Sequence, residues 1–181
     1  MNKKSLLAAL AVAIGATAGT VQATPPEVVE LDLTPSSGAL AACMPNARVS
    51  VTVRLTTDAR GFDVFRVHAT GLPPNTAFTT FLLEQTGAPF GAAEYIGDFT
   101  SNQNGVAEAS FSLIVAEAFA STLVDGHRVR VELNRIGAWF ADPVDDDFCL
   151  GPSSPVTPFD GDNEAGVQAF NSAGAPPLPL P

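Results

Sequence analysis

Strict alternation of apolar and polar residues is the feature that most constrains this chain of 181 residues. In the segment ARVSVTVRLTT, valine or leucine stands at every second position from 49 to 55. This period of two places one face of a β-strand on a core and the other in water. We therefore expect the chain to be built from half-buried strands.

Further alternating segments follow along the chain, separated by Gly, Pro and Asn residues that are typical of turns. They predict short strands at residues 27–33, 47–57, 63–72, 77–85, 93–101, 106–115 and 127–135. The Asn-Gly end of NQNG predicts a hairpin between the fifth and the sixth of these strands. Only Ala116–Thr122 has the character of a short helix.

Short strands without long crossover helices favour an all-β fold. We expect an antiparallel immunoglobulin-like sandwich of about seven strands, with an irregular C-terminal tail. A small closed barrel is the alternative, because an alternating pattern does not say which strands pair.

The segment GLPPNTAF, between the third and fourth predicted strands, carries a family resemblance. Leu72, Pro74, Thr76 and Phe78 resemble the corner of fibronectin type III domains, where Leu, Pro, Thr and Tyr recur at the same alternate positions. Phe78 stands where that family has tyrosine, so the hydroxyl bond that defines the corner is missing. The resemblance covers residues 63–85 and implies an immunoglobulin-like sandwich without implying a ligand. The mature chain also resembles exported bacterial proteins to which no activity is assigned, through GLPPNT, GDFTSNQNG and FCLG.

The first residues have the three parts of a secretory signal peptide. Lys3 and Lys4 precede an apolar run, and cleavage is expected after Ala23. The run is shorter than the roughly 20 apolar residues that a membrane span needs. We therefore divide the chain into a signal peptide at 1–23, a sandwich domain at 24–150 and a partly disordered segment rich in Pro, Gly and acids at 151–181. The protein is expected outside the cytoplasm, in the periplasm, at the cell surface or in the medium.

The charge of the mature chain excludes two classes of partner. Both lysines leave with the signal peptide, so positive charge comes from arginine alone, against nineteen acidic residues. Nucleic acids and anionic membranes are recognised by clustered positive charge, which this chain lacks. No later segment is apolar enough to be an integral membrane span. The expected partner is thus an unknown protein or envelope component.

Cys43 and Cys149 are the two cysteines of the chain. In an exported protein they most simply form one disulfide. The bond would close most of the mature chain into a loop and tie the start of the domain to its end. A metal site at the pair is disfavoured, because no histidine or further cysteine lies nearby.

Two acidic stretches, ADPVDDDFCLG and PFDGDNEAG, could supply oxygen ligands to Ca²⁺. The second begins like an EF-hand loop, but Ala165 stands where the sharp-turn glycine is needed and the closing glutamate is missing. A calcium site of another kind would use Asp145, Asp146, Asp147, Asp160, Asp162 and Glu164. The favoured interpretation is that the stretches are polar loops that keep the protein soluble, one of them beside the disulfide.

Catalytic machinery is not evident in the sequence. Neither His68 nor His127 lies in a nucleophile motif, and no catalytic residue is assigned. Trp139 is the one tryptophan; we expect it to cover the edge of the sandwich, with a binding contact as the alternative. The expected function is a non-enzymatic structural or binding module without a cofactor. The alternatives are a calcium-binding secreted protein and, less favoured, a hydrolase that uses an Asp/Glu pair.

Overall fold

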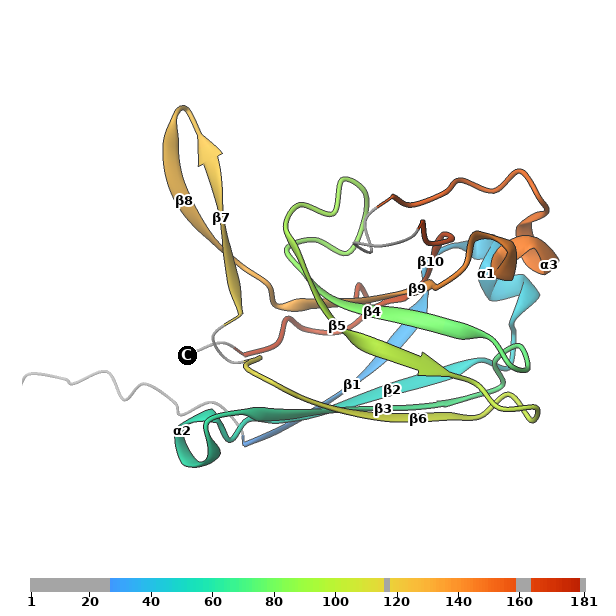
Figure 1. The fold of residues 1–181 in the computed structure, drawn as a ribbon, viewed down its shortest axis with the longest axis horizontal. Coiled ribbons are helices and arrows are strands. Elements are labelled where there is room, and N and C mark those ends of the chain that lie inside the picture. The colour runs from blue at the N-terminus through green and yellow to red at the C-terminus, as the bar shows by residue number, and fades with distance from the viewer. Residues whose placement is uncertain (1–26, 116–117, 159–163, 180–181) are drawn as a thin grey trace, which may run out of the picture.

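The computed structural model describes residues 27–115, 118–158 and 164–179, and its main feature is one antiparallel sheet of eight strands (Figure 1). Across the sheet the strand order is β5-β4-β9-β10-β1-β2-β3-β6, and β7 and β8 form a separate two-stranded sheet. The strands are β1 Val28–Pro35, β2 Arg48–Arg54, β3 Asp63–Thr70, β4 Ala77–Leu83, β5 Ala93–Thr100, β6 Ala107–Leu113, β7 Phe119–Val124, β8 His127–Glu132, β9 Arg135–Phe140 and β10 Gln168–Asn171. The helical turns are α1 Gly38–Cys43, α2 Thr57–Arg60, η1 Pro143–Asp146 and α3 Asp147–Leu150.

β1 joins the two halves of the large sheet. Its first six residues pair with β2, whereas Thr34 and Pro35 pair with β10. The outermost strands, β5 and β6, then come into contact at the far side, so the sheet nearly closes into a barrel. The ring of Phe111 on β6 fills this seam: a β-carbon at Gly97 of β5 would lie 2.4 Å from it. Side-chain packing therefore closes the barrel between β5 and β6, which form no hydrogen-bonded ladder with each other.

The expected immunoglobulin-like sandwich is wrong, and so is the resemblance to fibronectin type III domains that supported it. The eight strands form one nearly closed sheet instead of two packed sheets. Alternation correctly indicated the buried faces, since Val49, Val51 and Val53 are buried. It could not indicate pairing, because a barrel interior and a sandwich interior impose the same period of two.

The proposed corner at GLPPNT is a barrel-rim connection from β3 to β4, two strands that do not pair with each other. The backbone N–H of Thr76 donates to Ser101 Oγ at 2.9 Å, and the N–H of Leu72 donates to the Gly105 carbonyl at 3.0 Å. These bonds tie the segment to the 101–105 loop. Bonds to Ser101 and Gly105 thus hold the connection, which lacks the tyrosine hydroxyl of the fibronectin type III corner.

The predicted hairpin between 93–101 and 106–115 is also wrong, although its turn forms. Asn102 and Val106 are joined by a backbone hydrogen bond of 2.8 Å, and Gly105 has a φ of 70°. The flanking strands nevertheless pair elsewhere, β5 with β4 and β6 with β3. The Asn-Gly turn therefore connects β5 and β6, the two outermost strands of the sheet.

The main core fills the barrel, and a smaller one lies outside it. The largest fully buried side chains of the barrel include Phe65, Phe78, Phe140, Phe170 and Ile136. All residues of β10, and nearly all of β4 and β9, are buried. Their outer face carries a second cluster, formed by Phe81, Leu83, Trp139 and Ala165 with Phe90 packed against it. Two-sided burial explains why these strands lack clean alternation and why β9 and β10 were missed.

The helix predicted at 116–122 is wrong in its described part, because Phe119–Val124 is strand β7. Asp125 and Gly126, with φ of 50° and 80°, form a two-residue turn that leads into β8. Asp-Gly is a preferred pair for such turns, since both residues need positive φ. Ala116 and Glu117 lie outside the described residues.

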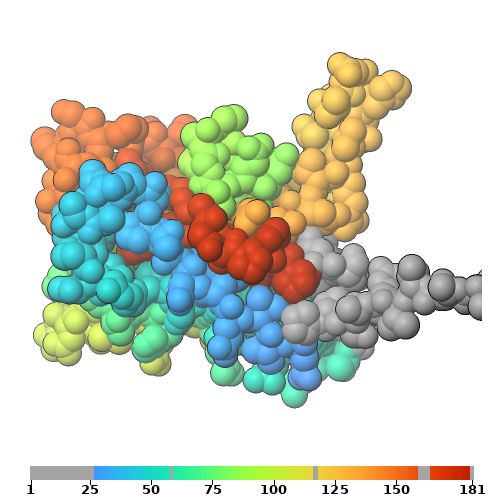
Figure 2. Space-filling model, turned by 180° about the vertical axis from the view of Figure 1, so that it is seen from behind, coloured from blue at the N-terminus to red at the C-terminus, as the bar shows by residue number. Residues whose placement is uncertain are grey.

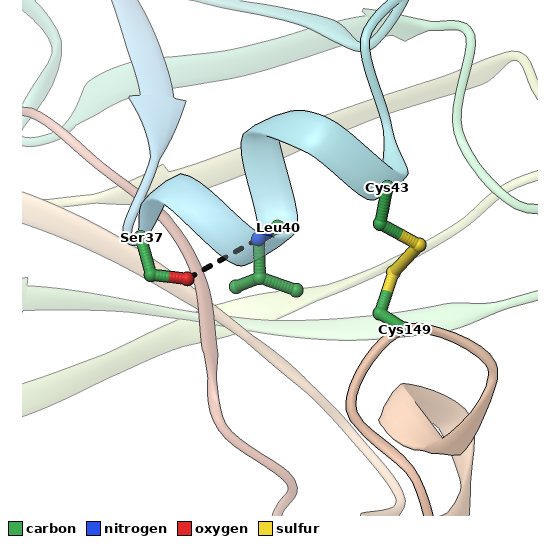
Figure 3. The surroundings of a disulfide bond; sticks show 4 residues. All are labelled: Ser37, Leu40, Cys43 and Cys149. Atoms are coloured by element: carbon green, nitrogen blue, oxygen red, sulfur yellow. Dashed lines mark hydrogen bonds between the residues drawn. A yellow bond between two sulfur atoms is a disulfide. The ribbon is translucent and has the colours of Figure 1, made fainter.

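The predicted disulfide between Cys43 and Cys149 is confirmed, and it joins α1 to α3 (Figure 3). Ser37 caps the start of α1, because its hydroxyl accepts the N–H of Leu40 at 3.2 Å, and Leu40 lies in the core. A disulfide of this kind fits an oxidising compartment outside the cytoplasm.

The remaining sequence predictions concern the two ends of the chain. The predicted signal peptide lies outside the described residues. Within the segment assigned to the C-terminal tail, β10 occupies the sheet between β9 and β1. Farther on, Leu178 is buried and its N–H donates to the Asn134 carbonyl at 2.9 Å. Within the part of the chain that the structure covers, no helix has the length and apolar character to cross a membrane.

Replacing both cysteines, Cys43→Ala with Cys149→Ala, should lower the free energy of unfolding by about 2–5 kcal/mol, because the bond joins residues 106 positions apart. Urea denaturation followed by Trp139 fluorescence measures the change. Reductant should destabilise the wild type and leave the double variant unaffected. An unchanged urea midpoint in the double variant would contradict the prediction.

Candidate interaction surface

The β7–β8 hairpin projects from the barrel as a separate arm (Figures 1 and 2). Every residue from Phe119 to Arg130 is exposed except Ala120, which is half-buried. Four of the exposed residues are large and apolar: Phe119, Leu123, Val124 and Val129, with exposed fractions of 52%, 68%, 51% and 41%. A two-stranded hairpin is marginally stable in water by itself, so this exposure is unusual for a purely structural element.

One face of the hairpin is nearly free of charge. Cross-strand pairing places Ala120 opposite Val131, Thr122 opposite Val129 and Val124 opposite His127. Because alternate residues share a face, these six side chains lie together on one side of the arm. We call them the apolar face. His127, at the tip, is its only titratable residue.

The opposite face is stiffened by interactions of arginine. The guanidinium of Arg130 lies 3.9 Å from the centre of the Phe119 ring. Arg130 Nε also donates to Glu132 at 2.5 Å, and this interaction lowers the pKa of the Glu132 carboxyl. Arg128, nearer the tip, donates to the Ser121 hydroxyl at 3.3 Å. These exposed contacts order the arm while contributing little to global stability.

The base of the arm is fixed to the barrel by buried groups. Leu133 and Ala118 are buried, and the Leu133 N–H donates to the Ala118 carbonyl at 3.1 Å. The buried carboxylate of Asp63 accepts the N–H of Val115 at 2.9 Å and those of Thr56 and Thr57 at 2.7 and 2.8 Å. The arm therefore has a buried root and an exposed shaft, an arrangement suited to contacting another molecule.

Asp146, in the acidic stretch at Asp145–Asp147, has a structural role. The carboxylate of Asp146 is fully buried; it accepts the N–H of Val167 at 2.8 Å and the hydroxyl of Ser154. These bonds fasten the segment after α3 to η1. Upstream, the Asp142 side chain caps η1 by accepting the Val144 N–H at 3.0 Å.

The two acidic stretches are not seen to form a cation site. Asp145 and Asp147 are partly exposed, Glu164 is exposed, and Asp160 and Asp162 lie outside the described residues. Among the residues described, no group of three or more His, Cys, Asp or Glu side chains could hold a metal ion. The calcium hypothesis therefore gains no support from the described part of the chain.

Trp139 lies inside the second cluster instead of on the surface. Its side chain is fully buried, and the rings of Phe81 and Phe90 meet it edge-on with centroids 5.5 and 5.0 Å away. A partner at the protein surface would not touch the indole in this arrangement. The residue packs the outer face of the sheet.

We predicted a strand at 127–135, whose alternation would place Val129, Val131 and Leu133 on a core, and therefore did not predict the arm. Only Leu133 is fully buried. The signal that could have revealed the hairpin is the pair Asp125-Gly126 between two segments rich in β-branched residues. No sequence signal shows that a hairpin stands away from the core. Comparison with protein-family models and with curated proteins finds no match, so the resemblance to exported bacterial proteins has no support.

Asp145 predicts a pH dependence of stability. Burial, and then the neighbouring Asp142, raise the pKa of its carboxyl. The folded state thus disfavours the charged form, and Asp145→Asn should raise the urea midpoint at pH 7. The gain should fade as the pH drops through the raised pKa, and vanish below the unfolded value of about 3.9, where both states are protonated.

Urea midpoints from pH 3 to pH 7 measure the effect. The matched control is Glu164→Gln, which removes an exposed charge from the other acidic stretch. A lower midpoint for Asp145→Asn at pH 7, or a gain that grows toward pH 3, would contradict the assignment.

Proposed function

We propose that the chain is an exported, non-enzymatic binding module of the cell envelope or the medium, and that the β7–β8 arm contacts its protein partner. The disulfide fits this setting, because such bonds persist in oxidising compartments. A rigid barrel that carries one projecting element also suits recognition, since a fixed scaffold lowers the entropy lost on binding.

The observation that carries the proposal is the exposed apolar face. Val124 and Val129 keep 51% and 41% of their area in water, although each apolar side chain gains free energy when buried. An apolar strip on an ordered arm is the kind of surface that marks protein interaction sites. Its near absence of charge means that a partner can cover it without burying an ion.

The arm also indicates the chemistry of the partner. An apolar groove on the partner would accept Val124 and Val129. An acidic group at the rim of that groove would pair with Arg128, which lies on the opposite face of the arm. Nucleic acid is a poorer fit, because Asp125 and Glu132 offset the two arginines of the arm. The partner is therefore a protein surface with an apolar centre and an acidic rim.

Photo-crosslinking in the producing cell tests the proposal. With a photoreactive residue at position 129, we expect one main adduct; at Ser110, exposed on the outer face of β6, that adduct should be missing. Val129→Asp should weaken binding of the purified partner by about tenfold or more, because the charge would be buried without a counter-ion. Calorimetry measures the affinity.

Ser110→Asp is the control for charge, and both variants should keep the wild-type urea midpoint. Equal adducts at positions 110 and 129, no adduct at either, or full binding by Val129→Asp would each refute the assignment of the arm. An adduct of two copies of this chain would refute a separate partner and make the arm a self-assembly element.

A further inference from the structure

The two long edges of the β7–β8 arm expose backbone groups as well as side chains. Within the described residues, β7 and β8 pair only with each other, so neither strand has a second neighbour. In Figure 2 the arm projects from the molecule, and its tip stands clear of the other coloured segments. Each strand therefore keeps one edge at which another strand could form a hydrogen-bonded ladder.

The register of the hairpin shows which backbone groups point outward. The N–H of Leu133 donates to the Ala118 carbonyl, so these two residues are a hydrogen-bonded pair at the root of the arm. Hydrogen-bonded and non-hydrogen-bonded pairs alternate along an antiparallel ladder. The non-hydrogen-bonded pairs are therefore Phe119–Glu132, Ser121–Arg130 and Leu123–Arg128. The N–H and C=O groups of these pairs point away from the hairpin.

The two edges differ in how well they are protected against pairing. Proteins commonly protect an exposed edge with charged side chains, prolines or bulges. At its outward-pointing positions β8 has three charged residues, Arg128, Arg130 and Glu132. β7 has the sequence FASTLV, without charge or proline, and its register with β8 is regular from end to end. The edge of β7 is thus open to another strand.

We propose that the partner of the arm adds an extended strand to the free edge of β7. This inference rests on the proposed function, because it says how that partner is held. The backbone groups of Phe119, Ser121 and Leu123 bond the added strand, while the rest of the partner covers the apolar face. Both faces of β7 are uncharged, so the added strand is uncharged along the contact and rich in β-branched or aromatic residues.

Proline substitution tests the edge, because proline removes the backbone N–H donor. Ser121 and Arg130 face each other in one non-hydrogen-bonded pair, so proline at either position leaves the bonds between β7 and β8 in place. Ser121→Pro should bind the purified partner about tenfold or more weakly than Ser121→Ala, which keeps the N–H. On the other edge, Arg130→Pro should bind like Arg130→Ala. Calorimetry measures the four affinities.

Amide hydrogen exchange, followed by NMR, tests the same edge in the wild-type protein. In the free protein the Thr122 N–H should exchange more slowly than the Ser121 N–H, because Thr122 lies in a hydrogen-bonded pair. The bound partner should slow exchange at Ser121 and Leu123 and leave exchange at Arg130 unchanged. If Thr122 loses its protection in Ser121→Pro, the variant arm is unfolded, and the wild-type measurement decides.

Equal affinities of a folded Ser121→Pro and Ser121→Ala, or a complex in which Ser121 stays unprotected, would overturn strand addition. In that case an adduct at position 129 would still support the arm as the contact, made through side chains alone. Protection at Arg130 in place of Ser121 would move the added strand to β8 and also overturn the proposal. If the wild-type protein gives no adduct, the proposed function fails, and this inference fails with it.

Discussion

The dual pairing of β1 is the constraint on which the rest of the structure depends. Its first six residues pair with β2, and its last two pair with β10. The Ser36 N–H extends this second contact by donating to the Ala169 carbonyl at 3.0 Å. Without the link to β10, β1–β2–β3–β6 and β5–β4–β9–β10 would be two sheets with free edges. With it, the edges that remain are β5 and β6, and these come together at the Phe111–Gly97 contact.

For this closure, the segment after β9 must cross the outside of the barrel and place β10 beside β1. Several contacts hold this segment. The disulfide fastens α3 to α1, directly after β1. The buried Asp146 carboxylate holds Val167, one residue before β10 begins. Both the disulfide and the Asp146 bond hold the connection between β9 and β10. They matter because β10 has only four residues, and its strand pairing alone would hold it weakly. Asp146, one of the acidic residues near Cys149, therefore has a structural role.

Different connections give the molecule two unlike regions. Where loops cover the outer face of β4, β9 and β10, apolar residues are buried on both sides of the sheet. Where the chain passes from β6 to β9, it leaves the barrel and forms the β7–β8 arm with little cover. A nearly closed sheet leaves few backbone groups for recognition, so the proposed partner contact lies on an element attached to the sheet.

The sequence by itself determined which faces of the early strands are buried, where turns occur, and that the cysteines can pair. These properties are local: period-two alternation at 49–53, positive φ at Gly105 and Gly126, and the oxidising chemistry expected of an exported chain. Only the tertiary structure decided that β5 and β6 do not form a hairpin, that β10 enters the sheet, and that Val129 faces water while Trp139 does not. Strand pairing and burial of a given apolar residue depend on contacts between segments far apart in the chain, and alternation carries no information about which segments these are.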